Sequence, residues 1–202
     1  MELEKQLKHC LPLDVETTGL DPTKHGMLSL GVKLFNGAEF YEENYLREGI
    51  EIHPKALAVN GENEANLLAR DESNYNSEYQ TLCQLIDFCE EHDSWVIIGK
   101  NPKFDYNFLL EIWKRNGGNE REFPFTYRVI NYGDFAIPLM ILEGMVVPPN
   151  GFSSSDIQNY LEIPEEPKPH NALNGAKYNV ECVTRVLEKM SRMASGVYCS
   201  GT

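Results

Sequence analysis

The sequence predicts a single α/β domain in which helices cover one mixed β-sheet. Apolar runs with strand-like composition alternate with segments whose apolar residues recur at helical spacing. The 202 residues, of which 42% are hydrophobic and 24% charged, are enough for one buried core. No internal repeat divides the chain, so we expect one domain over residues 1–202, with its core at about 10–190.

The first half of the sheet is expected to be an antiparallel meander. Asn36-Gly37 is a hairpin turn between two strand-like runs. Pro12 fits poorly in the first strand, because a central strand needs the N–H group that proline lacks. A polar segment at 46–75 follows, with a short helix at 54–59. The expected strands span residues 10–15, 27–35 and 39–45.

The second half alternates helices with short buried strands, a pattern typical of parallel pairing. Residues 94–98 (SWVII) are apolar after Ser94, as expected for a strand buried on both faces. Ser153 or Ser154 is the expected N-cap of a short helix. The expected strands span 94–98 and 128–131, and the expected helices span 78–90, 104–115, 132–143, 155–161 and 172–192.

The net charge of −13 argues against a protein that coats duplex nucleic acid by bulk electrostatics. It does not exclude an enzyme that takes one strand end into a metal-containing cleft. No run of 18 apolar residues occurs, so we expect no membrane partner, and the charged N-terminus is unlike a secretory signal. Five scattered cysteines without a C-x-x-C pair indicate free thiols of a reducing cytoplasm rather than a zinc site.

The most informative motif is Asp14-Val15-Glu16-Thr17-Thr18-Gly19, at the end of the first strand. Side chains alternate along a strand, so Asp14 and Glu16 point to the same face. Two adjacent buried carboxylates repel each other, and a hard cation such as Mg²⁺ or Mn²⁺ would offset that repulsion. The alternative is an edge strand with two solvated acids, but the apolar lead-in and the Thr-Thr-Gly turn favour the metal site.

Two later segments also carry chemically useful residues. Residues 99–105 (GKNPKFD) begin where a buried strand ends, and ligands collect at such ends in open α/β sheets. Asp105 could equally complement the dipole of its own helix, and Asn101 could be a turn residue. His170 precedes the last helix, whose positive end disfavours a protonated ring and suits a general base. The alternative is an ordinary loop histidine.

Together, D-x-E-T-T-G, G-x-N-x-x-F-D and P-H-x-A-L have the order and spacing of the DEDDh 3′–5′ exonucleases, which the chain resembles over roughly 10–190. Residues 52–61 and 156–164 also resemble segments of this family, which includes proofreading subunits and RNase T-like enzymes. The resemblance implies a ribonuclease-H-like fold, with a mixed five-stranded sheet (an antiparallel meander, then parallel strands) flanked by helices.

The resemblance further implies a two-metal phosphodiesterase that uses Mg²⁺ or Mn²⁺. Asp14 would bridge both cations, Glu16 would help to hold the one that activates water, and Asp105 would support the second through water. His170 would deprotonate the attacking water. The residues implied to contact the 3′-terminal nucleotide or to support the Asp105 side are Thr17, Thr18, Leu20, Asn101 and Phe104. A local positive rim is expected from Lys100, Lys103, Lys168 and Lys177.

One departure from the family is central. Its last motif is H-x-x-x-x-D, and the position of that aspartate, a ligand of the water-activating metal, is Gly175 here. Asn174 faces about 100° away on a helix, and Asn179, one turn later, is neutral. Smaller departures are Lys100, where the family often has His, and Asn131, where it often has Asp.

Three outcomes therefore stay open. The protein could be a slow exonuclease in which water or Asn179 fills the gap, with a preference for Mn²⁺. It could be a catalytically degenerate pseudo-exonuclease that binds 3′ ends or nucleotides, or a protein-interaction module. We expect the first, because the other motif residues remain. The expected partners are single-stranded DNA or RNA 3′ ends and short oligonucleotides; the choice between DNA and RNA, and a homodimer, stay open.

Overall fold

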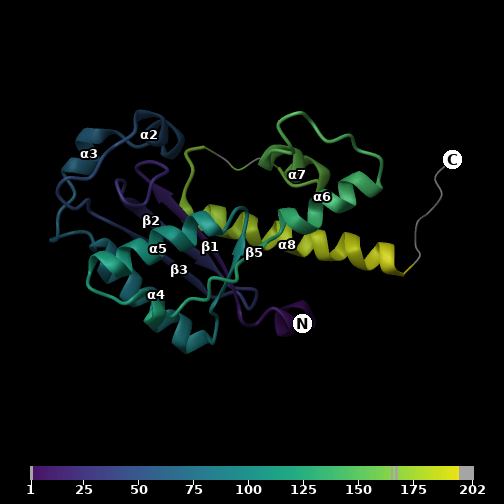
Figure 1. Cartoon of the computed structure of the whole chain (residues 1–202), viewed down its shortest axis with the longest axis horizontal. Coiled ribbons are helices and arrows are strands. Elements are labelled where there is room, and N and C mark those ends of the chain that lie inside the picture. The colour runs from purple at the N-terminus through teal and green to yellow at the C-terminus, as the bar shows by residue number, and fades with distance from the viewer. Residues whose placement is uncertain (1, 165, 167, 196–202) are drawn as a thin grey trace.

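A mixed five-stranded sheet forms the centre of the computed structural model, which describes residues 2–164, 166 and 168–195 (Figure 1). The strand order is β3-β2-β1-β4-β5. Strands β1, β2 and β3 pair antiparallel, whereas β4 pairs parallel with both β1 and β5. This confirms the expected antiparallel meander followed by parallel strands. The strands are β1 Cys10–Thr17, β2 Met27–Lys33, β3 Glu39–Glu43, β4 Val96–Gly99 and β5 Ile130–Asn131.

Helices cover both faces of the sheet. Buried apolar residues of α4 and α5 form one core cluster with β1 and β2, and those of α6, α7 and α8 form a second with β4. Figure 1 shows α6 and α7 beside the long α8. The helices are α1 Glu2–Gln6, α2 Pro54–Asn60, α3 Glu64–Leu68, α4 Glu78–His92, α5 Lys103–Arg115, a 3₁₀ turn Glu120–Glu122, α6 Gly133–Leu142, α7 Ser154–Tyr160 and α8 Ala172–Ala194.

Most expected elements are present within a few residues of their expected ends, but two helices were not expected. Helix α3 lies in the segment taken as irregular, where the Asn63 side chain caps its first turn by accepting from the Asn66 N–H. Helices α1 and α3 have five residues each, too few to show a helical repeat of apolar residues. Ser153 is the N-cap of α7, as one of the two expected alternatives.

Pro12 lies at the point where β1 changes its pairing partner. Cys10, Leu11 and Pro12 pair with β4, whereas pairing with β2 begins at Leu13. Pro12 therefore stands just outside the antiparallel ladder, so no donor is needed from it on that side. The conflict noted in the sequence is resolved by this offset between the two ladders.

Helix α8 starts directly on strand β2. A Cβ atom at Gly31 would collide with the backbone of Ala172 and Leu173 in the first turn of α8. Only glycine allows this approach of helix to strand. Helix α8 then packs along β1 and β2, which places its N-terminal turns over the end of β1.

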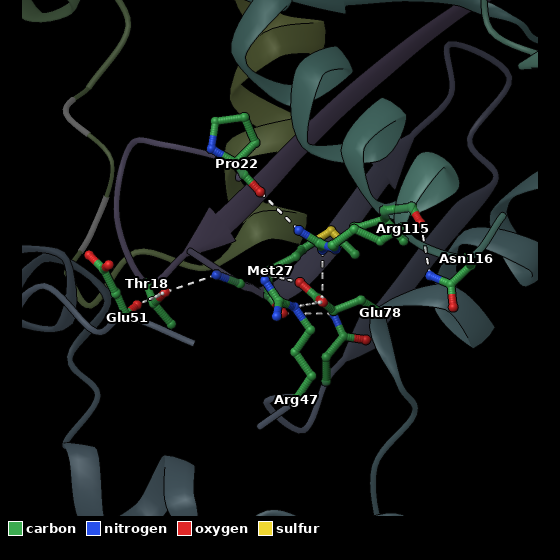
Figure 2. Close-up of polar contacts among 11 residues, drawn as sticks. Thr18, Pro22, Met27, Arg47, Glu51, Glu78, Arg115 and Asn116 are labelled. Atoms are coloured by element: carbon green, nitrogen blue, oxygen red, sulfur yellow. Dashed lines mark hydrogen bonds and ion pairs between the residues drawn. The ribbon is translucent and has the colours of Figure 1, made fainter. Parts of the chain in front are cut away.

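The loop between β1 and β2 is held by a buried charge network around Glu78 (Figure 2). One Glu78 oxygen accepts from the Met27 N–H at 2.6 Å, and the other lies 3.0 Å from an Arg115 nitrogen and 3.9 Å from Nε of Arg47. Arg115 also donates to the Pro22 carbonyl at 2.9 Å. Helices α4 and α5 thereby fix the loop that follows the acidic strand.

The cysteines agree with the expected free thiols. Cys10, Cys83, Cys89 and Cys182 are unpaired, and Cys199 lies outside the described residues. In the described part of the chain, no helix has both the length and the apolar composition needed to cross a membrane.

Candidate active site

Asp14 and Glu16 lie on the face of β1 that α8 covers. Their neighbours Leu13 and Val15 point to the opposite face, into the core formed with α4 and α5. The period-two alternation expected from the sequence thus separates the acids from the apolar side chains. Both acids are half-buried.

Asp105 joins this pair from the first turn of α5. Its side chain is only 4% exposed, and Oδ1 accepts a hydrogen bond from the Val15 N–H, between the two acids, at 3.1 Å. Burial, together with the charge of Glu16, raises the pKa of Asp105 to about 8, although the Val15 N–H opposes the shift. Residue patterns alone placed Asp105 near a strand end, and the family resemblance implied that it joins Asp14 and Glu16; the structure places it beside both.

The carboxylates of β1 also have raised pKa values. Burial, then repulsion from Asp105, Glu16 and Glu166, raises the pKa of Asp14 well above its usual value. Burial and Glu166 raise the pKa of Glu16 to about 7. Among the described residues, no Lys or Arg forms an ion pair with any of these four acids. The cluster therefore lacks compensating positive charge from the protein.

The third motif lies at the start of α8. Asn171 caps the helix, since its side chain accepts from the N–H groups of Leu173 and Asn174. His170, just before the cap, donates its backbone N–H to the Val59 carbonyl of α2 at 3.3 Å. Its Nδ1 lies 3.7 Å from Oε2 of Glu166. His170, in the loop that precedes α8, is thus tied to α2 through its backbone and lies beside Glu166 of the same loop through its ring.

Gly175 faces Asp14 directly. A Cβ atom at position 175 would collide with the Asp14 carboxylate. The aspartate expected at this position from the family resemblance would therefore lie against Asp14, whose carboxylate occupies the space where its Cβ would be.

Asn179 does not fill the gap at Gly175. Its amide is buried, donating to the Leu13 carbonyl at 2.9 Å and accepting from the Lys100 N–H at 3.2 Å. The amide nitrogen thus bonds to β1 and the amide oxygen to the residue after β4, so Asn179 links α8 to both strands. Both ends of the amide therefore have partners, and an Asn179 that filled the gap would have to give these hydrogen bonds up.

The three residues implied to line a nucleotide slot differ in exposure. Leu20 is 82% exposed just past the acidic strand, as expected for a side chain that packs on a base. Thr17 is buried and donates to the Gly19 carbonyl. Thr18 is fully buried, with its hydroxyl donating to the Glu51 carbonyl (Figure 2). Leu20 is consequently the side chain of the three that is free to contact a ligand.

Asn101 and Phe104 lie beside Asp105, at the junction of β4 and α5. Asn101 has a left-handed backbone (φ 51°), which asparagine tolerates, and its carbonyl accepts from the Phe104 N–H. Phe104 packs on Phe108, with ring centroids 4.9 Å apart. Both residues thus shape the turn from which Asp105 projects.

Only part of the expected lysine rim borders the acids. Lys100 and Lys168 line the cavity that contains Asp14. Lys177 instead pairs with Glu39 at 3.3 Å, and the Lys103 ammonium lies over the ring of Tyr106. The positive rim is therefore smaller than expected, because two of its four lysines have other partners.

A cavity of about 600 Å³ opens beside Asp14, within the range of about 300–1,000 Å³ typical of small-molecule sites. Asp14, His170 and Gly175 line it, together with residues that the sequence reasoning did not select, namely Val59, Tyr132, Ser154, Ser155, Gln158, Glu166 and Tyr178. Glu166 is the most informative of these. Its place four residues before His170 was the one feature of the sequence that could have identified Glu166 as a residue of the site.

The sheet order, the acids of β1 and α5 and the histidine before α8 together define a DEDDh-type 3′–5′ exonuclease domain with a ribonuclease-H-like fold. Residues 9–187 match the family described as "3'-5' exoribonuclease Rv2179c-like domain", and the chain belongs to that family.

Individual relatives agree with this assignment. The chain is 24% identical over 183 residues to a PolC-type DNA polymerase III of Thermotoga maritima, a match that covers 90% of this chain and 12% of the polymerase. The nuclease domain of 3′hExo, a DEDDh family member solved with rAMP, is similar with a TM-score of 0.66, 14% identity and coverage of 93% and 92% of the two chains. Exonuclease I of E. coli, solved with a dA16 oligonucleotide, has a TM-score of 0.68, 15% identity and coverage of 94% and 42%.

Proposed function

We propose that this protein is a metal-dependent 3′–5′ exonuclease that removes nucleotides one at a time from single-stranded or short RNA. The supporting observation is the clustering of acids around β1 beside His170: Asp14 and His170 line one cavity, Glu16 and His170 line a second, and Asp105 is hydrogen-bonded to the Val15 N–H between the two β1 acids. Among the described residues, none of these acids forms an ion pair with Lys or Arg. Buried acids without such partners are typical of functional sites.

The donor set suits a divalent cation. Carboxylate oxygens are the ligands that Mg²⁺ and Mn²⁺ prefer. Glu166 lines the same cavity as Asp14, and its Oε1 is buried without a hydrogen-bond partner. In the described part of the chain, no three His, Cys, Asp or Glu side chains are already arranged to hold a metal, so binding requires side-chain movement. Asp14, Glu16 and Asp105 would hold the cations, which supply stabilisation of the entering and leaving oxygens.

The residues of the chain have distinct roles in this proposal. His170 takes the proton of the attacking water. The water oxygen bonds to the phosphorus, the bond from phosphorus to the O3′ of the preceding nucleotide breaks, and that O3′ gains a proton. A nucleoside 5′-monophosphate leaves. Leu20, exposed beside the acids, packs on the terminal base and fixes the register of the strand.

A single strand suits the surface better than a duplex. The net charge is −13, and Lys100 and Lys168 are the lysines on the cavity with Asp14, enough for a few phosphates at a strand end. The description of the matching family as exoribonuclease favours RNA over DNA. The free thiols of the described cysteines suit the cytoplasm, which we propose as its location.

A second candidate, a pseudo-exonuclease that binds a 3′ end without cutting it, is supported by Gly175. The site lacks the aspartate that the family resemblance assigns to the water-activating metal, and Asn179 is engaged elsewhere. Weaker metal binding would leave the attacking water poorly activated while the cavity still accepts a nucleotide.

One experiment separates the two candidates. Wild type, Asp14→Ala and a control, Asp87→Ala, whose exposed acid lies on α4 far from the motif in sequence, are incubated with 5′-labelled single-stranded RNA and DNA in Mg²⁺ or Mn²⁺. We expect stepwise shortening from the 3′ end by wild type and Asp87→Ala. Asp14→Ala should lose about 10³-fold, equivalent to about 4 kcal/mol of transition-state stabilisation.

Other results would lead elsewhere. Cleavage that survives Asp14→Ala would come from a contaminant. Tight binding of RNA without cleavage would favour the pseudo-exonuclease, and absence of both would favour a protein-interaction module. Sedimentation of the same samples decides between a monomer and the homodimer that the resemblance leaves open.

A further inference from the structure

Glu166 is a further carboxylate on the cavity that contains Asp14 and Gly175. It comes from the loop between α7 and α8. Its side chain is 15% exposed. Its charge contributes to the raised pKa values of both Asp14 and Glu16.

The two oxygens of Glu166 have different surroundings. Oε2 lies 3.7 Å from Nδ1 of His170, close enough for an ion pair when the ring is protonated. Oε1 is buried from solvent and has no hydrogen-bond partner. A buried carboxylate oxygen without a partner is costly, and such a group needs an explanation in a ligand or a functional role.

Other residues near Gly175 on α8 are engaged elsewhere. Asn179 bridges β1 and β4 with both ends of its amide. Glu181 accepts from Nε of Arg185 at 2.9 Å. Glu166 is therefore the acid that combines proximity to Asp14 with an unused oxygen.

We propose that Glu166 supplies, from the loop before α8, the metal-binding carboxylate that Gly175 does not provide. This inference rests on the proposed function, since it assigns one more ligand to the same cation site. The carboxylate reaches the site from the loop before His170, instead of from the helix after it. Because position 175 has no side chain, the Asp14 carboxylate can lie against α8. Glu166 adds a second carboxylate to the same cavity.

The test measures metal binding directly, without nucleic acid. Free Mn²⁺ is titrated by electron paramagnetic resonance against the full chain in four forms: wild type, Glu166→Gln, Asp14→Ala and a control, Glu162→Gln. Glu162 is an exposed acid of the same loop region. We expect Glu166→Gln to raise the Mn²⁺ Kd about 10- to 100-fold, as loss of groups that support a metal site does, and Glu162→Gln to leave it unchanged. Circular dichroism confirms that the variants are folded.

Two results overturn the inference in different ways. If Asp14→Ala loses Mn²⁺ but Glu166→Gln binds it like wild type, the metal site exists and Glu166 is not a ligand; a fall in cleavage alone would then show that Glu166 only positions His170. If wild type binds no Mn²⁺, or Asp14→Ala binds it equally well, the proposed metal-dependent function fails together with the inference.

Discussion

Acids withdrawn from solvent have opposite surroundings at two places in this molecule. Glu78 is 6% exposed and faces Arg115 and Arg47, with a further hydrogen bond from the Met27 N–H (Figure 2). Asp14 and Asp105 are close to other acids instead, and no Lys or Arg of the described residues pairs with them. The same residue chemistry is thus neutralised within the protein at one place and left uncompensated at the other.

The difference separates a structural role from a functional one. Burial raises the pKa of Glu78 too, but the Met27 hydrogen bond and the two arginines oppose the shift. At the acidic cluster, carboxylates reinforce one another, and Asp105 reaches a pKa of about 8. Uncompensated buried charges lower the stability of a fold, and proteins keep them mainly at sites where a bound ligand supplies the missing charge.

The largest expected effect on stability is the loss in Glu78→Gln. This change leaves Arg115 and Arg47 without their buried partner, and we expect the free energy of unfolding to fall by about 3 kcal/mol. Urea unfolding in a chelating buffer measures it, with Glu90→Gln, an exposed acid of the same helix, as the control. Equal stability of the two variants would contradict a structural role for the network.

The matched change at the acidic cluster, Asp105→Asn, should act in the opposite direction. It removes a buried charge and keeps an oxygen that can accept from the Val15 N–H, so the metal-free protein should gain on the order of 1–3 kcal/mol at pH 8. The same urea unfolding measures it, and cleavage should be lost. A less stable Asp105→Asn variant would show that this charge is compensated after all.

Stability should fall as pH rises, whereas acids with lowered pKa values in the folded state make stability rise with pH. Glu16 and Asp105 have folded pKa values of about 7 and about 8, above their unfolded values, so the folded state binds more protons between about pH 5 and pH 8. Stability of the metal-free protein should fall as pH rises, by about 1.4 kcal/mol per pH unit for each such group. Thermal unfolding in chelator measures the slope, which should be shallower in Asp105→Asn and should flatten with saturating Mn²⁺.

The smallest effect concerns Leu20. Its side chain is exposed in the free protein, so Leu20→Ala should change the stability by less than about 0.5 kcal/mol. Loss of its contact with the terminal base should raise KM for RNA about fivefold, or about 1 kcal/mol. Leu142→Ala, another exposed leucine, is the control. An unchanged KM would remove Leu20 from the proposed slot.

Local patterns predicted the sheet and the acids of β1 well. Period-two alternation placed Asp14 and Glu16 on one face of the strand, and helical spacing located α4, α5 and α8. The rim of lysines was overestimated, because the partners of Lys103 and Lys177 come from packing that periodicity does not describe.

Long-range contacts could not be predicted from the sequence. Glu166 lies in a Pro-rich loop, and only the fold brings it beside Asp14, which is 152 residues earlier in the chain. The partners of Glu78 likewise come from three separate segments. The residues adjacent in sequence to Glu166 and Glu78 form no motif that predicts a role, because the role of each depends on residues that are distant in the chain.

Gly31 has a consequence for anyone who screens this protein by saturation mutagenesis. Any larger residue there would lift the first turn of α8 from the sheet and move the loop that carries His170 and Glu166 with it. A screen for activity would therefore rank position 31 with the acids, although it takes no part in the chemistry. Separating such supporting positions from reacting ones requires a second screen, for abundance of folded protein.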